Sequence, residues 1–72
     1  MEVLYTITAQ QVTVEEEVFN CYGIACESGG KTIRRIDDIS CDRQLIEEKI
    51  KQFNNLGLSQ EHFQDAVEDI LC

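Results

Sequence analysis

The sequence is poor in basic residues, contains no proline and only one histidine, and has no long apolar run. Six Lys and Arg against fourteen Asp and Glu give a net charge of −8. A nucleic-acid backbone or an anionic membrane surface would repel such a chain, so we expect neither as a direct partner. A basic protein or a divalent cation remains permitted.

No stretch approaches the roughly 20 apolar residues that span a bilayer. The start of the chain, residues 1–8, lacks the basic segment and the apolar run of a signal peptide. We therefore expect a cytoplasmic protein, in which thiols stay reduced. The four cysteines contain no CxxC pair, so we expect no zinc site. Cys21 and Cys26 are expected to act as small buried side chains.

Motifs for catalysis are absent: there is no nucleophile elbow, phosphate-binding loop or paired-histidine metal motif. Cys41 lies near the start of a predicted first helix of about 15 residues, which would be roughly 22 Å long. His62 lies beyond the other end of that helix, at the start of the second helix. The two residues cannot form a Cys–His pair within one chain, and we expect His62 to be a partly exposed residue in the first turn of the second helix. We predict that the protein is not an enzyme and has no catalytic, cofactor-binding or metal-binding residues.

The apolar supply, including 18 Val, Ile and Leu residues, suffices for one small domain over residues 1–72. Alternating apolar and polar residues predict strands in the first half of the chain. A turn is expected near 13–16, and the two glycines of segment 28–31 predict a hairpin. The predicted strands run from about 3 to 10, 17 to 27 and 32 to 37.

The second half has helical spacing. Ser40 is the expected N-cap of a first helix and Gly57 its C-cap, while Ser59 caps a second helix. The short link at 57–58 predicts near-antiparallel helices. The predicted fold is α+β: a three-stranded antiparallel meander followed by a helical hairpin packed on one face. The stripes expected to face the sheet are Leu45, Ile46, Ile50, Phe53 and Leu56, and then Phe63, Ala66, Val67, Ile70 and Leu71.

The second predicted strand is apolar on both faces, as in a strand that is covered twice. Its apolar residues are Val18, Tyr22 and Ile24 on one face and Phe19, Cys21 and Ala25 on the other. Two helices cover only one face, so self-association through the sheet is one solution, with Phe19, Tyr22 and Ile24 as the candidate interface. The alternatives are that one helix wraps further round the sheet, or that exposed apolar side chains are tolerated.

Residues 37–72 contain nine acidic and three basic side chains. In a helical hairpin, the end of the second helix returns to the start of the first, which would bring acids together. The candidate acidic end consists of Asp37, Asp38, Asp42, Glu68 and Asp69. Carboxylates at a helix C-terminus oppose its dipole, so Glu68 and Asp69 either pair with arginines, face a basic partner or hold a cation. The loop at 37–42 lacks the pattern of an EF-hand.

The same return of the second helix would bring Cys72 toward Cys41. A reversible disulfide between these two residues and a pair of independent thiols are the two alternatives.

Several short segments, taken in order, resemble a family of short uncharacterised proteins from clostridia and related Firmicutes, a domain of unknown function. They are Cys21-Tyr22-Gly23-Ile24-Ala25, Asp38-Ile39-Ser40, Asn55-Leu56-Gly57-Leu58-Ser59, His62 and Val67-Glu68-Asp69-Ile70-Leu71. The resemblance spans Tyr5 to Leu71 and implies no activity, cofactor or catalytic residue. It implies that 22–24 and 68–69 belong to the family's pattern. Gly23 would then mark a bulge or close backbone packing.

The sequence thus favours a non-catalytic interaction module, an adaptor or regulator that binds a basic protein partner through its acidic end or its uncovered sheet face. The alternative is a redox- or metal-responsive regulator that uses Cys41, Cys72 and nearby carboxylates. An enzyme subunit without chemistry of its own is not separable from the first hypothesis by sequence.

Overall fold

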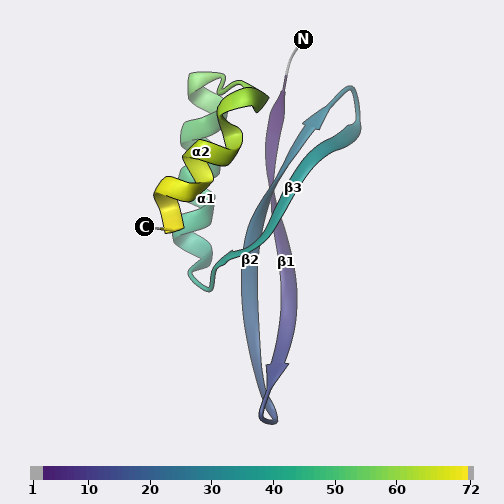
Figure 1. The fold of residues 1–72 in the computed structure, drawn as a ribbon, viewed down its shortest axis with the longest axis vertical. Helices are drawn as coiled ribbons and strands as arrows, with labels where there is room; N and C mark the ends of the chain where they lie inside the picture. Colours follow the sequence, from purple (N-terminus) through teal and green to yellow (C-terminus); the bar gives the residue numbers. More distant parts are fainter. Residues whose placement is uncertain (1–2, 72) are drawn as a thin grey trace.

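The computed structural model describes residues 3–71 of the chain. Its strands pair antiparallel in the order β1-β2-β3, and two helices follow (Figure 1). The predicted α+β fold is therefore confirmed. The elements are β1 (Leu4–Val14), β2 (Glu17–Ser28), β3 (Lys31–Ser40), α1 (Arg43–Leu56) and α2 (Gln60–Leu71).

β1 and β2 form a long hairpin whose far end projects beyond the helices (Figure 1). Their pairing continues without a shift to Val14 opposite Glu17. The two residues between them, Glu15 and Glu16, both have positive φ, 51° and 68°, as a two-residue type I′ turn requires. The last β2–β3 pair toward this end joins Tyr22 to Ser40. We call the two-stranded segment beyond it, residues 10–21, the β-arm.

β3 crosses β2 very closely at Gly23. The β2–β3 register shifts between Tyr22 and Ile24. A Cβ on Gly23 would lie 2.2 Å from the backbone oxygen of Ile36 and 2.7 Å from the Cα of Asp37. Only glycine leaves room for this approach. The expectation that Gly23 marks a bulge or close backbone packing is confirmed.

The start of α1 differs from the prediction. The end of α1 and the start of α2 agree with it. Asp42 is the N-cap, and its carboxylate accepts a backbone N–H of the first turn. Ser40 ends β3, and its hydroxyl accepts the Asp42 N–H at 3.0 Å. The Ser40 prediction was wrong because both residues are good caps and β3 runs three residues further than expected. Gly57, with φ of 63°, is the C-cap of α1, and Ser59 caps α2.

The core lies between the sheet and the two helices. It is centred on Tyr5, whose ring centre lies 5.5 Å from that of Phe53 and 5.3 Å from that of Phe63. Its hydroxyl donates to the Leu58 carbonyl at 2.7 Å. The fully or nearly buried core side chains are Tyr5, Ile24, Cys26, Ile39, Ile46, Phe53, Phe63 and Val67.

The last residue of each predicted helix stripe does not reach this core. Leu56 and Leu71 are 80% and 59% exposed. Each is the last residue of its helix, so it lies past the surface against which the helix packs. Their assignment to the inner stripes was wrong for this reason.

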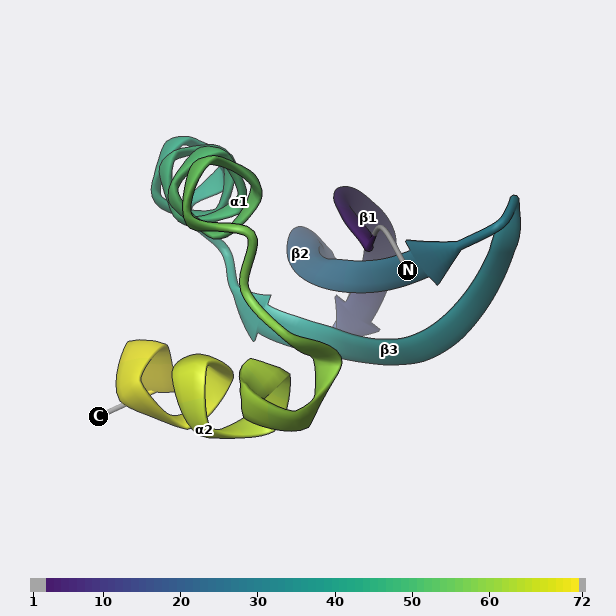
Figure 2. The same ribbon diagram turned by 90° about the horizontal axis from the view of Figure 1, so that it is seen from above.

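The two helices pack on different parts of the twisted sheet. α1 lies against β1 and β2, and α2 lies against β3. Figure 2 shows α1 end-on while α2 lies across the view, so the helices cross obliquely and are not near-antiparallel. Strand twist explains the difference, because neighbouring strands offer the helices surfaces of different orientation. No helix of residues 3–71 is long and apolar enough to span a membrane.

Candidate functional site

The three residues of the predicted sheet interface do not share an exposed surface. Ile24 is fully buried under the helices. Tyr22 is partly buried beside it, with the Arg43 guanidinium 5.8 Å from its ring centre. Phe19 is 43% exposed. No partner can contact Ile24, because the helices cover the sheet face on which it lies.

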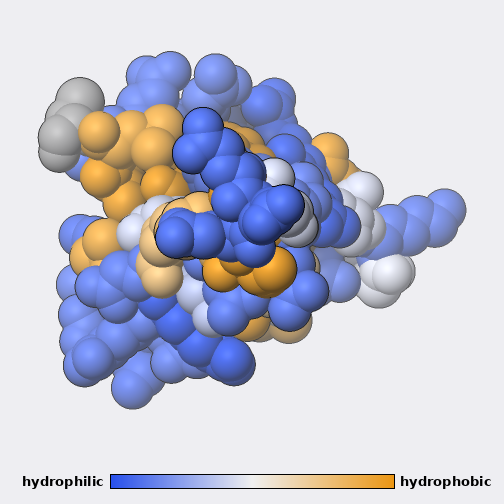
Figure 3. All heavy atoms as spheres, turned by 90° about the horizontal axis from the view of Figure 1, so that it is seen from below, coloured by the Kyte–Doolittle hydropathy of each residue, from blue (hydrophilic) through white to orange (hydrophobic). Residues whose placement is uncertain are grey.

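Phe19 instead belongs to an apolar group on the β-arm. Val12 lies directly opposite Phe19 in the hairpin, and strand alternation places both on the face away from Ile24. Val14 shares this face, and Val18 lies on the other. These four side chains are between 36% and 61% exposed. In Figure 3, which looks at the tip of the arm from below, hydrophobic atoms lie beside strongly hydrophilic ones.

Sequence reasoning missed Val12, Val14 and Val18 as surface residues, although a length comparison could have found them. The 14 residues of α1 span about 21 Å at 1.5 Å per residue. The 12 residues of β2 span about 40 Å at roughly 3.3 Å per residue. One layer of such helices cannot cover the whole hairpin, so its end has to be exposed.

The three aspartates of the predicted acidic end have local partners. The Asp37 carboxylate accepts from Arg35 at 2.7 Å and from the Thr8 hydroxyl at 3.1 Å. The bond from Arg35 lowers the pKa of Asp37 below its usual value. Asp42 caps α1. Asp38 lies beside Cys21 in a left-handed backbone conformation, with φ of 57°. Their placement is therefore explained by the fold.

Glu68 and Asp69 are exposed on α2, whose last turn contains no basic residue. The end of α2 lies near the start of α1 in Figure 1, but Figure 2 separates the two ends. The views thus do not place these acids against the three aspartates. Within residues 3–71, no group of three His, Cys, Asp or Glu side chains could hold a metal ion.

Cys41 contacts Cys21, a pairing that sequence reasoning missed. Their Sγ atoms are 3.7 Å apart, and both thiols are free. Cys21 is 7% exposed, which confirms its predicted burial, whereas Cys41 is exposed. Hydrogen bonding to Asp38, followed by burial, raises the pKa of Cys21 to about 11. The prediction that paired Cys41 with Cys72 involves a residue outside the described part of the chain.

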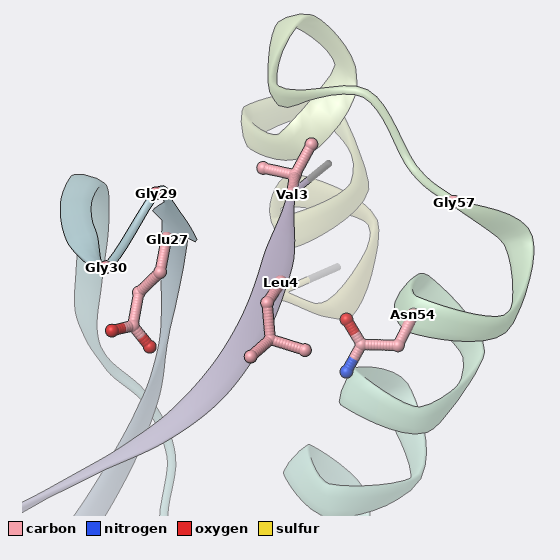
Figure 4. Close-up of a pocket in the computed structure, with 7 residues that line it drawn as sticks. All are labelled: Val3, Leu4, Glu27, Gly29, Gly30, Asn54 and Gly57. Carbon is pink, nitrogen blue, oxygen red and sulfur yellow. The ribbon is translucent and has the colours of Figure 1, made fainter. Parts of the chain in front are cut away.

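An open hollow of about 690 Å³ lies between the β2–β3 turn and the end of α1 (Figure 4). Asn54 points from α1 to β1, where its side-chain amide accepts the Tyr5 N–H at 2.8 Å and donates to the Tyr5 carbonyl at 3.0 Å. The Asn54 side chain therefore pairs with the backbone N–H and carbonyl of Tyr5 at the edge of β1, as a neighbouring strand would. The lining residues are Val3, Leu4, Glu27, Gly29, Gly30, Asn54 and Gly57.

Among the described residues of this lining, Glu27 is the one titratable side chain, and its carboxylate accepts the Thr6 hydroxyl at 3.0 Å. The hollow thus offers a surface for contact.

These features define a small α+β protein in which residues 3–71 present an apolar β-arm and a pair of neighbouring thiols. The chain belongs to a family of unknown function, DUF6514, whose model matches residues 1–72. The predicted membership of a domain family of unknown function is confirmed. No curated protein and no solved structure matches the chain.

Proposed function

We propose that the protein is a cytoplasmic, non-catalytic interaction module that binds a protein partner through the β-arm. The observation that carries this proposal is the group of four large apolar side chains on a hairpin end that no other element of residues 3–71 covers. Their exposed fractions are 36% for Val12, 52% for Val14, 61% for Val18 and 43% for Phe19.

Two physical arguments support a contact surface here. An isolated two-stranded hairpin is at best marginally stable in water, so a projecting one gains from being covered. Exposed apolar side chains that lie together on a protein surface often mark an interaction site, whereas singly scattered ones do not. All side chains from Ala9 to Asn20 are exposed, so a partner could contact both strands of the arm.

The charge around the β-arm indicates the chemistry of the partner. Glu15, Glu16 and Glu17 lie at its tip, next to the apolar group, and the whole chain has a net charge of −8. The complementary surface is apolar at its centre and basic at its rim. We therefore propose a basic protein as the partner, since rim charges of opposite sign accelerate association.

A pair of matched substitutions tests this proposal. Phe19→Ser removes the largest apolar side chain of the arm, and Leu56→Ser removes an 80% exposed leucine at the end of α1. Tagged wild type and both variants would be used to capture proteins from a clostridial lysate, the source that the sequence resemblance suggests. Reducing buffer is used throughout, and circular dichroism checks that each variant is folded.

The proposal predicts a basic protein that wild type and Leu56→Ser retain, that Phe19→Ser loses, and that high salt releases. Equal retention by all three proteins would place the contact outside the arm. If the captured protein is a second copy of this chain, the contact is that of a homodimer and the proposed basic partner is wrong.

A second candidate surface is the exposed pair Glu68 and Asp69, because the last turn of α2 contains no basic residue that would neutralise it. Glu68→Lys combined with Asp69→Lys, in the same capture experiment, would remove a basic partner that binds there. Retention by this double variant and loss by Phe19→Ser would assign the contact to the β-arm.

A further inference from the structure

The strand register brings Cys21 and Cys41 together. Tyr22 pairs with Ser40 in the antiparallel β2–β3 ladder. This is the last pair of the ladder toward the β-arm, and Cys21 and Cys41 are the residues next to this pair in the chain. Directly opposed residues in such ladders have Cα atoms about 4.5–5.5 Å apart. A disulfide accepts Cα separations of about 4.4–6.8 Å. Continuation of the register past Tyr22 and Ser40 would therefore give the two residues a backbone separation that suits a disulfide.

The side chains agree with the backbone. The two Sγ atoms lie 3.7 Å apart, in contact but unbonded. Cys41 is exposed at the junction between β3 and α1, and Cys21 is 7% exposed beneath it. An exposed thiol that contacts a buried one is the arrangement of a reactive and a resolving cysteine.

We propose that Cys21 and Cys41 form an oxidation site, at which a peroxide converts the two thiols into an intramolecular disulfide. This proposal does not depend on the proposed function of the β-arm. In an otherwise reducing compartment, such a disulfide is transient and redox-sensing.

The reaction takes two steps. The Cys41 thiolate attacks one oxygen of hydrogen peroxide, the O–O bond breaks, and sulfenic acid and hydroxide form. The Cys21 sulfur then attacks the Cys41 sulfur, and the S–O bond breaks. The hydroxyl leaves with the Cys21 proton as water. Two thiols lose two electrons and two protons, and one peroxide becomes two waters.

The surroundings favour Cys41 as the first residue to react. Asp38 and burial raise the pKa of Cys21 to about 11, so at neutral pH its thiolate fraction is very small. The exposed Cys41 has direct access to peroxide. Cys21 is then held in contact with the sulfenic acid that forms.

The disulfide would join covalently the base of the β-arm and the start of α1, which the end of the β2–β3 ladder and the contact of Arg43 with Tyr22 already hold near each other. Cys21 lies at the base of the β-arm, opposite Gln10, and Cys41 lies just before the N-cap of α1. Closing the loop of residues 21–41 restricts the unfolded chain, so the oxidised protein should melt at a higher temperature.

Peptide mapping of the full chain tests the proposal directly. After hydrogen peroxide treatment and alkylation, trypsin places Cys41 in the peptide 36–43, and Cys21 and Cys26 together in the peptide 1–31. We expect these peptides to be disulfide-linked within a monomer, with a mass loss of two hydrogen atoms. Fragmentation of the linked peptide between residues 21 and 26 identifies Cys21 as the partner.

Variants then separate the roles. The linkage should persist in Cys72→Ser and disappear in Cys21→Ala, where Cys41 sulfenic acid should accumulate and react with dimedone. In Cys41→Ser, labelling of Cys21 should be much slower. If Cys21→Ala does not fold, fragmentation of the linked wild-type peptide still shows which cysteine is bonded to Cys41. Linkage of Cys41 to Cys26, Cys72 or a second chain, or its conversion to sulfonic acid beside an alkylatable Cys21, would overturn the proposal.

Discussion

Replacing Gly23 by alanine should strongly destabilise the protein. The added Cβ would meet the Ile36 backbone oxygen at 2.2 Å and the Asp37 Cα at 2.7 Å. Both contacts are far inside van der Waals range, and backbone atoms cannot move aside as the end of a side chain can. β3 would have to lift from β2 at the crossing, or the β2–β3 pairing would have to shift.

The expected loss of stability in Gly23→Ala is a large part of the total stability of the domain. A domain of this length is stable by about 4–11 kcal/mol, and overpacking of a closed site costs about 1–3 kcal/mol. The backbone contact places Gly23→Ala at the upper end, about 3 kcal/mol. With a urea dependence of about 1 kcal/mol per molar for a small protein, the unfolding midpoint would fall by about 3 M.

Urea unfolding, followed by circular dichroism, measures this shift. Thr13→Ala on the exposed arm is the control, and its stability should stay within about 0.5 kcal/mol of wild type. Adding Thr8→Ala to Gly23→Ala removes the third close contact, at 2.8 Å to the Thr8 hydroxyl, and should not restore stability. A Gly23→Ala protein as stable as Thr13→Ala would refute the close crossing of β3 over β2.

Three further predictions concern the arm, the sheet edge and pH. Replacing Glu15 and Glu16 by Asn and Gly should stabilise the hairpin by about 1 kcal/mol in urea unfolding, since both positions have positive φ; unchanged or lower stability would contradict the turn geometry. Asn54→Ala leaves the Tyr5 N–H and carbonyl without their partner and should cost about 1–2 kcal/mol. Sedimentation velocity should also show more self-association of this variant through the freed edge of β1, and an unchanged profile would argue against edge protection. The pKa values of Tyr5 and Cys21 are raised from 10.0 to about 12 and from 9.0 to about 11, so the unfolded chain releases these protons first. Melting temperature should therefore hold below pH 9 and fall between pH 9 and 12, and a flat profile there would contradict the burial of Tyr5 and the hydrogen bonding of Cys21 to Asp38.

The element order could be predicted because each signal was local. Strand alternation, the Gly29–Gly30 turn, the Gly57 C-cap and the Ser59 N-cap depend on residues near one another in sequence. Gly23 could also be interpreted, since an isolated glycine within an apolar strand favours close backbone approach.

The features that escaped prediction depend on register and on length. The contact between Cys21 and Cys41 follows from the β2–β3 register, which contains two shifts, at Tyr22/Ile24 and at Cys26/Glu27. Alternation cannot reveal such shifts. The arm was missed because the first strand was predicted only as far as about residue 10, whereas pairing with β2 carries it to Val14.

Ile24 illustrates the same limit at the candidate site. Alternation correctly separated the two faces of β2, but it could not tell which face the helices cover. That choice depends on how α1 and α2 pack on a twisted sheet, and it determines that Ile24 is buried while Phe19 remains available to a partner.

Photo-crosslinking from position 19 tests the central claim, that the apolar face of the β-arm is a protein-contact surface. A photoreactive phenylalanine analogue would replace Phe19 in one protein and Leu56 in the other, and both would be irradiated in a native lysate under reducing conditions. We expect a covalent adduct with a basic protein from position 19 only, and its yield should fall as salt is added. Equal adducts from both positions, or none from position 19, would contradict this claim.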